Sequence, residues 1–373
     1  MTLKGSQKKW GQDSLEKECH HYLPSCGARR QHLRHPTDAG RMRVRLTRER
    51  RVICLLLGLT CVSITQAAPV LRLEQSIGLP GVNGRLDHLA VDVSTAHLFI
   101  CALSNNSVEL VDLRKGASVG SITGLRNPQG VAYATEPNRL YVANAKGGVC
   151  NIYDGKSLAA LGQLNLKDDA DNVRYDSRAK RIYVGYGDGA IATIDAITGA
   201  QLGTVKLPAH PESFQLEQHG SRIFANVPSA GCISVIDRTK GEVIAQWKTG
   251  LAYANFPMAL DEPDRRLFIG CRSPATLLVL DTESGKVVAK TGIGGDADDI
   301  FYDGKRRSLY VICGTGEIDV IGQEDRDRYK ATEKIPTAPG ARTGLFIPEL
   351  NSLLVAVPNE GKRRAEIHRY TLH

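Results

Sequence analysis

Short apolar runs alternate with polar, glycine-rich turns along most of the chain after residue 68. In residues 181–205 (RIYVGYGDGAIATIDAITGAQLGTV), two apolar runs flank a glycine-rich turn, and a second turn follows at Thr198-Gly199. Short apolar runs that are rich in β-branched side chains and bounded by turn residues predict β-strands. No stretch of useful length has the 3.6-residue period of an amphipathic helix. The pattern therefore predicts an all-β protein.

The same pattern returns seven times. Each copy contains an apolar strand of the type Leu-Tyr-Val, and consecutive copies are 41 to 44 residues apart. These strands begin at Leu98, Leu140, Ile182, Ile223, Leu267, Leu309 and Leu353. One apolar strand precedes this strand in each copy, a third strand follows it, and most copies add an outer strand. Seven units of four short antiparallel strands predict a seven-bladed β-propeller.

The two ends of the repeat region fit a closed ring. The seventh copy ends after its third strand, IHRYTL at 367–372, and has no outer strand of its own. An additional strand, PVLRLEQSI at 69–77, precedes the first copy. We expect this N-terminal strand to complete blade 7, because ring closure leaves no open sheet edge. The prediction is a single propeller domain that spans residues 68–373.

The positive charge of the chain lies outside this domain. The net charge of +8 comes from 48 Lys and Arg residues against 40 Asp and Glu residues. Thirteen of these basic residues and five of the acidic residues precede Ala68, so residues 68–373 carry 35 of each. A neutral domain gives no electrostatic reason to expect nucleic-acid binding.

Residues 42–67 have the three parts of a secretory signal peptide. Five arginines precede an apolar run at 52–64, and small residues follow at 65–69. The run of 13 residues is too short to cross a bilayer comfortably as a helix. We therefore expect cleavage, no membrane span in the mature protein, and a periplasmic or extracellular location. Residues 1–41 precede Met42, and we interpret them as a disordered or misassigned extension.

The repeat also resembles a known family. LYVAN at 140–144, third strands such as ISVID at 233–237, and the Thr-Gly and Ser-Gly turns are similar to the YVTN-repeat propellers, the YncE-like family of exported bacterial proteins. The resemblance covers about 69–373. It implies an exported seven-bladed propeller that serves as a surface protein, a periplasmic binding protein or an enzyme subunit. It specifies no reaction, because the blade motif reflects packing and turn chemistry.

Polar residues gather where each innermost strand begins. These positions surround one mouth of the central channel, and ligands of propellers usually bind there, where loops converge on a rigid scaffold. Eleven residues before each Leu-Tyr-Val-type strand stand Asp87, Gln129, Asp171, Glu212, Phe256, Asp298 and Arg342. The next position contributes the polar residues His88, Asn172, Ser213 and Asp299. These two sets form the candidate ligand-binding channel.

The channel residues leave three interpretations open. They are turn residues that hydrogen-bond to the local backbone and to channel water. Alternatively, they hold a divalent cation through Asp87, Asp171, Glu212 and Asp298, with Asn172 as a further oxygen ligand. Oxygen ligands suit Ca²⁺ or Mg²⁺, and a contribution from His88 favours Zn²⁺ or Mn²⁺. In the third interpretation, Arg342 pairs with a ligand carboxylate or phosphate, and His88 donates or accepts a proton.

Two functions agree with these observations. The first is a monomeric binding protein or scaffold that presents its channel mouth to a small ligand or a protein partner. The second is a metal-assisted lyase or lactonase-type hydrolase, in which a cation polarises the substrate carbonyl. The sequence contains no HExxH or CxxCH motif. It therefore leaves open whether the protein is an enzyme.

Overall fold

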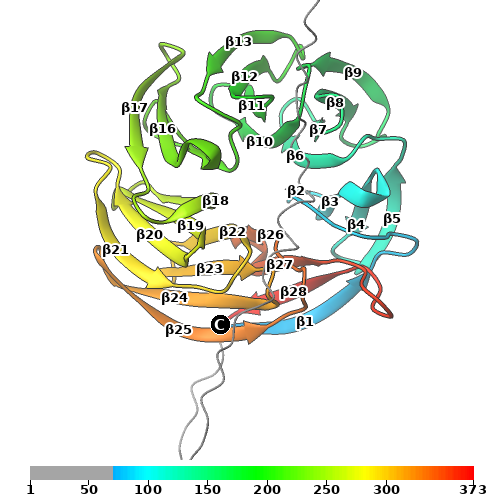
Figure 1. The fold of residues 1–373 in the computed structure, drawn as a ribbon. Coiled ribbons are helices and arrows are strands. Elements are labelled where there is room, and N and C mark those ends of the chain that lie inside the picture. Colours follow the sequence, from blue (N-terminus) through cyan, green and yellow to red (C-terminus); the bar gives the residue numbers. More distant parts are fainter. Residues whose placement is uncertain (1–69) are drawn as a thin grey trace, which may run out of the picture. The chain divides into compact units, whose positions relative to one another are not determined.

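The computed structural model describes residues 70–373, which form a ring of seven four-stranded antiparallel sheets (Figure 1). The predicted seven-bladed propeller is confirmed. The predicted extension at 1–41 and signal peptide at 42–67 lie outside the described residues. The innermost strands of blades 1 to 7 are β2 (Leu89–Asp92), β6 (Pro128–Ala134), β10 (Ala170–Asp176), β14 (Phe214–Leu216), β18 (Tyr253–Asp261), β22 (Ala297–Asp303) and β26 (Gly344–Ile347).

The remaining strands follow outward in the same blade order. The second strands are β3 (His97–Ala102), β7 (Arg139–Asn144), β11 (Arg181–Tyr186), β15 (Arg222–Val227), β19 (Arg266–Ser273), β23 (Ser308–Cys313) and β27 (Ser352–Val357). The third strands are β4 (Ser107–Asp112), β8 (Val149–Asp154), β12 (Ala190–Asp195), β16 (Cys232–Asp237), β20 (Ala275–Asp281), β24 (Glu317–Asp325) and β28 (Glu366–Leu372). The outer strands are β5 (Ala117–Ile122), β9 (Ala160–Asn165), β13 (Gln201–Lys206), β17 (Glu242–Lys248), β21 (Val287–Gly292), β25 (Arg328–Pro336) and, in blade 7, β1 (Leu71–Gly78).

The N-terminal strand closes the ring as predicted. β1 pairs antiparallel with β28, with Leu71 opposite Leu372 and Ile77 opposite Ile367. In Figure 1 the blue β1 lies beside the red β28 at the outside of blade 7. The observed strand is displaced by one or two residues from the predicted range 69–77. The first and last strands of the domain therefore share one sheet.

The core lies between the blades. Seven clusters of buried apolar side chains each join two neighbouring blades. Because successive side chains of a strand point to opposite faces, Leu98 packs between blades 7 and 1, and Phe99 between blades 1 and 2. In the next copy, Leu140 joins Phe99, and Tyr141 packs towards blade 3. Each such side chain contributes about 1.5–3 kcal/mol through burial, so the repeated motif encodes the ring.

An aspartate ends the third strand of blades 1 to 5 and holds the turn that follows. Asp195 Oδ1 accepts hydrogen bonds from the backbone N–H groups of Ile197 and Thr198, at 3.0 and 2.8 Å. Gly199 then takes a positive φ of 78°, a conformation that costs glycine little. Asp281 forms the same turn in blade 5 with Ser284. These turns fix the connection to the outer strand.

The described residues contain only three short 3₁₀ helices, at Leu103–Asn105, Pro228–Ala230 and Pro348–Leu350. None of the helices in this part of the chain is long and apolar enough to cross a membrane. The five cysteines between residues 70 and 373 are buried and free.

Candidate ligand-binding channel

A β-bulge recurs at the beginning of the innermost strands. The pairing of β10 with β11 skips Asp171 and Asn172 between Ala170 and Val173. The pairings of β6, β18 and β22 with their second strands shift at the equivalent positions. A bulge opposes two residues to one and re-aims the side chains of the extra residues. The two sets of polar residues from the sequence analysis, called the polar columns below, therefore share this bulged backbone at the channel mouth in these four blades.

Blades 1 and 4 reproduce the arrangement just before their inner strands. The backbone N–H of Asp87 donates to Cys101 O at 2.7 Å, and His88 O accepts from Cys101 N at 3.1 Å. Glu212 N–H likewise donates to Asn226 O at 2.9 Å. Two consecutive residues thus face one residue of the second strand in these blades as well.

An arginine of blade 5 neutralises the carboxylates of blade 6. Arg272 Nη2 lies 2.6 Å from Asp298 Oδ1, and its Nη1 lies 3.4 Å from Asp296 Oδ1. Its guanidinium carbon lies 3.9 Å from the centroid of the Phe256 ring, a cation–π contact. Arg342 Nη1 lies 2.9 Å from Asp296 Oδ2. Arg342, the sequence candidate for substrate binding, is therefore engaged in an ion pair within the protein.

A second group links blade 1 to blades 6 and 7. Arg85 Nη2 lies 3.0 Å from Asp87 Oδ2. His88 lies 3.8 Å from Asp87 Oδ1 through Nε2 and 3.5 Å from Asp299 Oδ2 through Nδ1. Asp299 Oδ2 also accepts the backbone N–H of Gly344 at 2.9 Å.

The ionisation of this group follows from its burial and its neighbours. Burial alone lowers the pKa of His88, but the carboxylates of Asp299 and Asp87 outweigh it and raise the pKa to about 10. Burial raises the pKa of Asp87, against the opposing effects of Arg85 and His88. The neighbouring carboxylates therefore favour the protonated form of His88, which contacts residues of blades 1 and 6.

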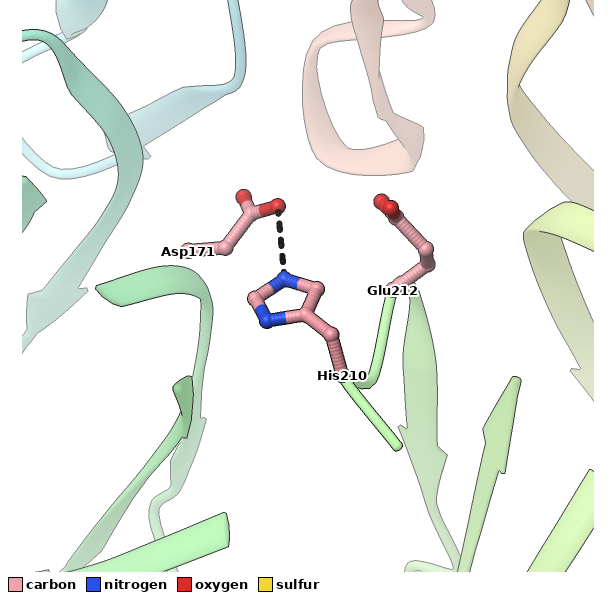
Figure 2. Close-up of side chains that lie close together, drawn as sticks. All are labelled: Asp171, His210 and Glu212. Atoms are coloured by element: carbon pink, nitrogen blue, oxygen red, sulfur yellow. Dashed lines mark ion pairs between the residues drawn. The ribbon is translucent and has the colours of Figure 1, made fainter. Parts of the chain in front are cut away.

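The third group lies between blades 3 and 4. Asp171, His210 and Glu212 each offer one donor atom, and these three atoms lie within 4.8 Å of one another. Figure 2 shows the three side chains converging from the two blades, with the His210 ring directed towards the carboxyl group of Asp171. His210 Nε2 lies 3.8 Å from Asp171 Oδ2, and its Nδ1 lies 2.6 Å from Gly187 O.

Electrostatics distinguish Glu212 from the other mouth carboxylates. Among residues 70–373, its carboxylate forms no hydrogen bond or ion pair. Burial raises the pKa of Glu212, and the carboxylates of Asp171 and Asp298 raise it further. Burial lowers the pKa of His210, but the Asp171 carboxylate and Gly187 O outweigh this effect and raise it. The neighbouring carboxylates therefore oppose ionisation of Glu212, and no Lys or Arg side chain of residues 70–373 forms an ion pair with it.

The remaining candidates of the two columns support these groups. Gln129 Nε2 donates to Asp169 Oδ1 at 3.4 Å. Asn172 is 1% exposed, and its amide lies 3.5 Å from Asp171 Oδ1. Ser213 Oγ accepts a 3.4 Å contact from Arg174 Nη2. The structure therefore distributes the predicted site residues over three groups at one mouth.

A cavity of about 380 Å³ occupies the channel next to this mouth. Its walls come from the inner strands of six blades and include Val91, Val131, Phe301 and Leu345. The polar side chains among its lining residues include those of His88, Asp299, Gln215 and Arg174. Arg174 lies 5.5 Å from the centroid of the Phe214 ring and has no carboxylate within 4.0 Å among the residues that the structure describes.

The two sets of aligned positions leave out four charged residues of the channel: Arg85, Arg174, His210 and Arg272. The sequence already places His210 just outside them. Two of them, Arg85 and His210, lie two positions before the bulge residue of their blade. The equivalent positions in blades 3 and 6 hold Asp169 and Asp296. Extending the alignment of the copies by two positions would have found this column. Arg272 lies at the end of a second strand, and the two columns contain no position from that part of the repeat.

Comparison with known proteins identifies the fold and no closer relationship. No protein-family model matches the chain, and no curated protein sequence matches it. The structure is similar to "Kuenenia stuttgartiensis Hydrazine Synthase" at a TM-score of 0.68 and 16% identity, over 79% of this chain and 99% of that chain. It is also similar to a chain of the "Mitotic Checkpoint Complex", with a TM-score of 0.70 and 14% identity, over 87% of this chain and 99% of that chain. The similarity to the "RRP9 WD40 repeats" has a TM-score of 0.70 and 10% identity, over 81% of this chain and 97% of that chain. At these identities the likeness shows the β-propeller fold and no function.

Proposed function

We propose that the protein is an exported, monomeric β-propeller of the YVTN-repeat type that binds a small anionic ligand in its central channel. The observation that carries this proposal is the cavity of about 380 Å³ beside the polar mouth. Small-molecule sites are typically concave, mostly apolar, and equipped with a few placed polar groups. The cavity has all three properties.

Arg174 determines the chemistry of the ligand. Its guanidinium lines the cavity, and no carboxylate of the described residues lies within 4.0 Å of it, in contrast to Arg272 and Arg342 at the mouth. A guanidinium that is stacked on an aromatic ring is well placed to bind a carboxylate with two parallel hydrogen bonds. The apolar walls favour a ligand whose remaining part is aliphatic or aromatic.

A thermal-shift screen of the full chain tests this proposal. The probes are aliphatic and aromatic mono- and dicarboxylates, with the corresponding amides as uncharged partners. We expect at least one carboxylate to raise Tm, because a ligand that binds only the folded state stabilises it. The increase should disappear in Arg174→Gln and persist in Arg72→Gln, since Arg72 is exposed on the outer strand β1. Equal shifts in both variants, or no shift with any carboxylate, would refute the proposal.

The export part of the proposal rests on the sequence of residues 42–67. N-terminal sequencing of the protein recovered from a periplasmic or secreted fraction tests it. A mature N-terminus near Ala68 agrees with cleavage of a signal peptide, and a retained Arg43–Arg51 region contradicts it.

A protein partner is a further candidate ligand for the same mouth. Leu251 is 94% exposed and Tyr253 is 58% exposed. Both precede or begin the innermost strand of blade 5, on the type of connection that carries His210 in blade 4. Solved propellers of this shape include a chain of a multi-protein complex, the "Mitotic Checkpoint Complex".

A metal-assisted lyase or lactonase-type hydrolase is the second candidate function. The specific observation in its favour is the convergence of Asp171, His210 and Glu212. Hydrolysis would add the elements of water across a lactone ester bond and release a hydroxy acid. A colorimetric assay of acid release from a panel of lactones, with and without added divalent cations, tests this candidate.

A further inference from the structure

We propose that Asp171, His210 and Glu212 bind a divalent transition-metal ion at the channel mouth. Asp171 lies in the bulge of β10 in blade 3, and the other two lie in the connection between β13 and β14 that enters blade 4. Their donor atoms lie within 4.8 Å of one another (Figure 2). The inference goes beyond ligand binding in the cavity and holds whether or not the cavity binds a carboxylate.

The separation of the donor atoms suits a shared ion better than a direct contact. His210 Nε2 and Asp171 Oδ2 are 3.8 Å apart, which is too long for a hydrogen bond. Two metal–ligand bonds of about 2.1 Å at a tetrahedral angle place their donor atoms roughly 3.4 Å apart. A small inward movement of side chains brings all three donors to one ion.

The hydrogen bond on the far side of the imidazole prepares His210 as a ligand. Its Nδ1 lies 2.6 Å from the carbonyl oxygen of Gly187, which can only accept a hydrogen bond. Nδ1 therefore carries the proton, and in the neutral ring Nε2 presents its lone pair to the carboxylates. Metal-binding histidines usually donate their other N–H to a carbonyl or a carboxylate in this way.

The ion pairs at the mouth select these two carboxylates from the four that the sequence suggested. Asp87 is paired with Arg85, and Asp298 is paired with Arg272. Glu212, in contrast, forms no ion pair or hydrogen bond within residues 70–373. Within the same residues, the polar side-chain partners of the Asp171 carboxylate are His210 and the amide of Asn172, at 3.8 and 3.5 Å. A cation held here would interact with two carboxylates that form no ion pair with a Lys or Arg side chain of residues 70–373.

The donor set indicates the kind of metal. One imidazole and two carboxylates suit Zn²⁺ or Mn²⁺, whereas Ca²⁺ prefers six to eight oxygen ligands and Mg²⁺ retains several waters. Three protein ligands leave at least one coordination position for water or a bound molecule, as in catalytic zinc sites. We therefore expect Zn²⁺ to bind and Ca²⁺ to bind far more weakly.

Isothermal titration of the untagged full chain with Zn²⁺, after chelator treatment and dialysis, tests the inference. The N-terminal region contains further cysteines and histidines, at Cys19, His20, His21, Cys26, His32 and His35. Because every variant retains them, the decisive quantity is the difference between wild type and variant. We expect Glu212→Gln and His210→Gln each to remove one equivalent of Zn²⁺, or to weaken it at least about 100-fold.

The matched control is Asp298→Asn, which changes a carboxylate of the same mouth that is already paired with Arg272. This variant should retain the Zn²⁺ equivalent, and circular dichroism verifies that each variant is folded. The proposal is overturned if wild type and Glu212→Gln bind the same number of Zn²⁺ ions, or if Asp298→Asn loses the ion equally. The carboxylate screen is performed in the presence of chelator, so failure of one proposal leaves the other test intact.

Discussion

Replacing Arg272 with methionine tests whether the carboxylates of blade 6 belong to a structural ion pair. Arg272 extends from the end of β19 and reaches across to blade 6. Its Nη2 lies 2.6 Å from Asp298 Oδ1, and its Nε donates to Ala297 O at 3.0 Å. Its guanidinium also stacks on Phe256. Methionine retains an unbranched apolar side chain and removes every one of these polar contacts.

The expected loss follows from burial. The side chains of Arg272 and Asp298 are 22% and 11% exposed, so the pair is neither a surface pair nor a fully buried one. Breaking a buried pair costs about 3–5 kcal/mol, and exposed pairs contribute about 0–1 kcal/mol. The cation–π contact adds about 1 kcal/mol. Because Asp298 retains Arg85 at 3.7 Å, we expect Arg272→Met to lower the free energy of unfolding by about 3 kcal/mol.

Urea unfolding in a double-mutant cycle with Asp298→Asn isolates the pair. We expect a coupling energy of about 1.5–2 kcal/mol between the two side chains. Arg272→Lys should fall between wild type and Arg272→Met, because it retains the charge and loses the planar fork. Arg72→Met, on an exposed face of β1, should change stability by less than about 0.5 kcal/mol. A loss below about 0.5 kcal/mol for Arg272→Met, with no coupling to Asp298, would refute this reasoning.

Three further predictions concern the turns, the blade contacts and the mouth. Burial raises the pKa of Asp281, but hydrogen bonds from Ser284 and Arg266 outweigh this effect and lower the pKa from 3.8 to about 2. The ionised Asp281 carboxylate therefore stabilises the fold above about pH 4, and this stabilisation is lost as the pH falls to 2. Asp281→Asn should therefore be about 1–2 kcal/mol less stable than wild type at pH 7, and urea midpoints should converge near pH 2. Tyr141→Phe should cost about 1–2 kcal/mol in the same assay, because the buried hydroxyl donates to Ala196 O in the next blade at 3.0 Å. Gly130→Ala should weaken Zn²⁺ at least about tenfold in calorimetry, since a Cβ there would lie 2.0 Å from Asp171 O and displace that ligand.

The fold was predictable because the same pattern of strands and turns repeats seven times along the sequence. The apolar alternation at Leu98-Phe99 and its six repeats determines which residue faces which neighbouring blade. The missing outer strand of the seventh copy and the additional strand before the first also predicted ring closure, which the pairing of β1 with β28 confirms. One copy alone would have predicted only a few antiparallel strands. The common period of 41 to 44 residues identified each copy as one blade of a propeller.

The site was predictable only as a set of positions. The column that begins with Asp87 and Asp171 gathers at one mouth because its members precede or begin the innermost strands, and six of the seven blades have the bulge or its equivalent there. How those residues pair could not be predicted, because the partners come from different blades and different strands. Arg272 of a second strand reaches Asp298 of the next blade, and Arg85 reaches Asp87 within its own loop.

The column of Arg85 and His210 has a structural signature of its own. In five of the seven blades, the equivalent residue adopts a positive φ: Asn127, Asp169, Ala254, Asp296 and Gly340. Arg85 and His210 are the two members without this conformation. Asparagine, aspartate and glycine tolerate a positive φ best, so their recurrence in the aligned copies signals a shared turn.

The two proposed sites lie on one strand, and their separation has a measurable consequence. Asp171 and Arg174 are three residues apart on β10, which corresponds to roughly 10 Å of extended chain. A carboxylate ligand that is too short to contact both Arg174 and an ion at Asp171 should bind with the same affinity with and without Zn²⁺. A ligand of about this length with a second donor group should bind more tightly with Zn²⁺, and should increase Zn²⁺ affinity by the same factor. Titrating dicarboxylates of increasing length, with and without Zn²⁺, would reveal a length threshold if the sites share one ligand, and parallel affinities at every length if they act separately.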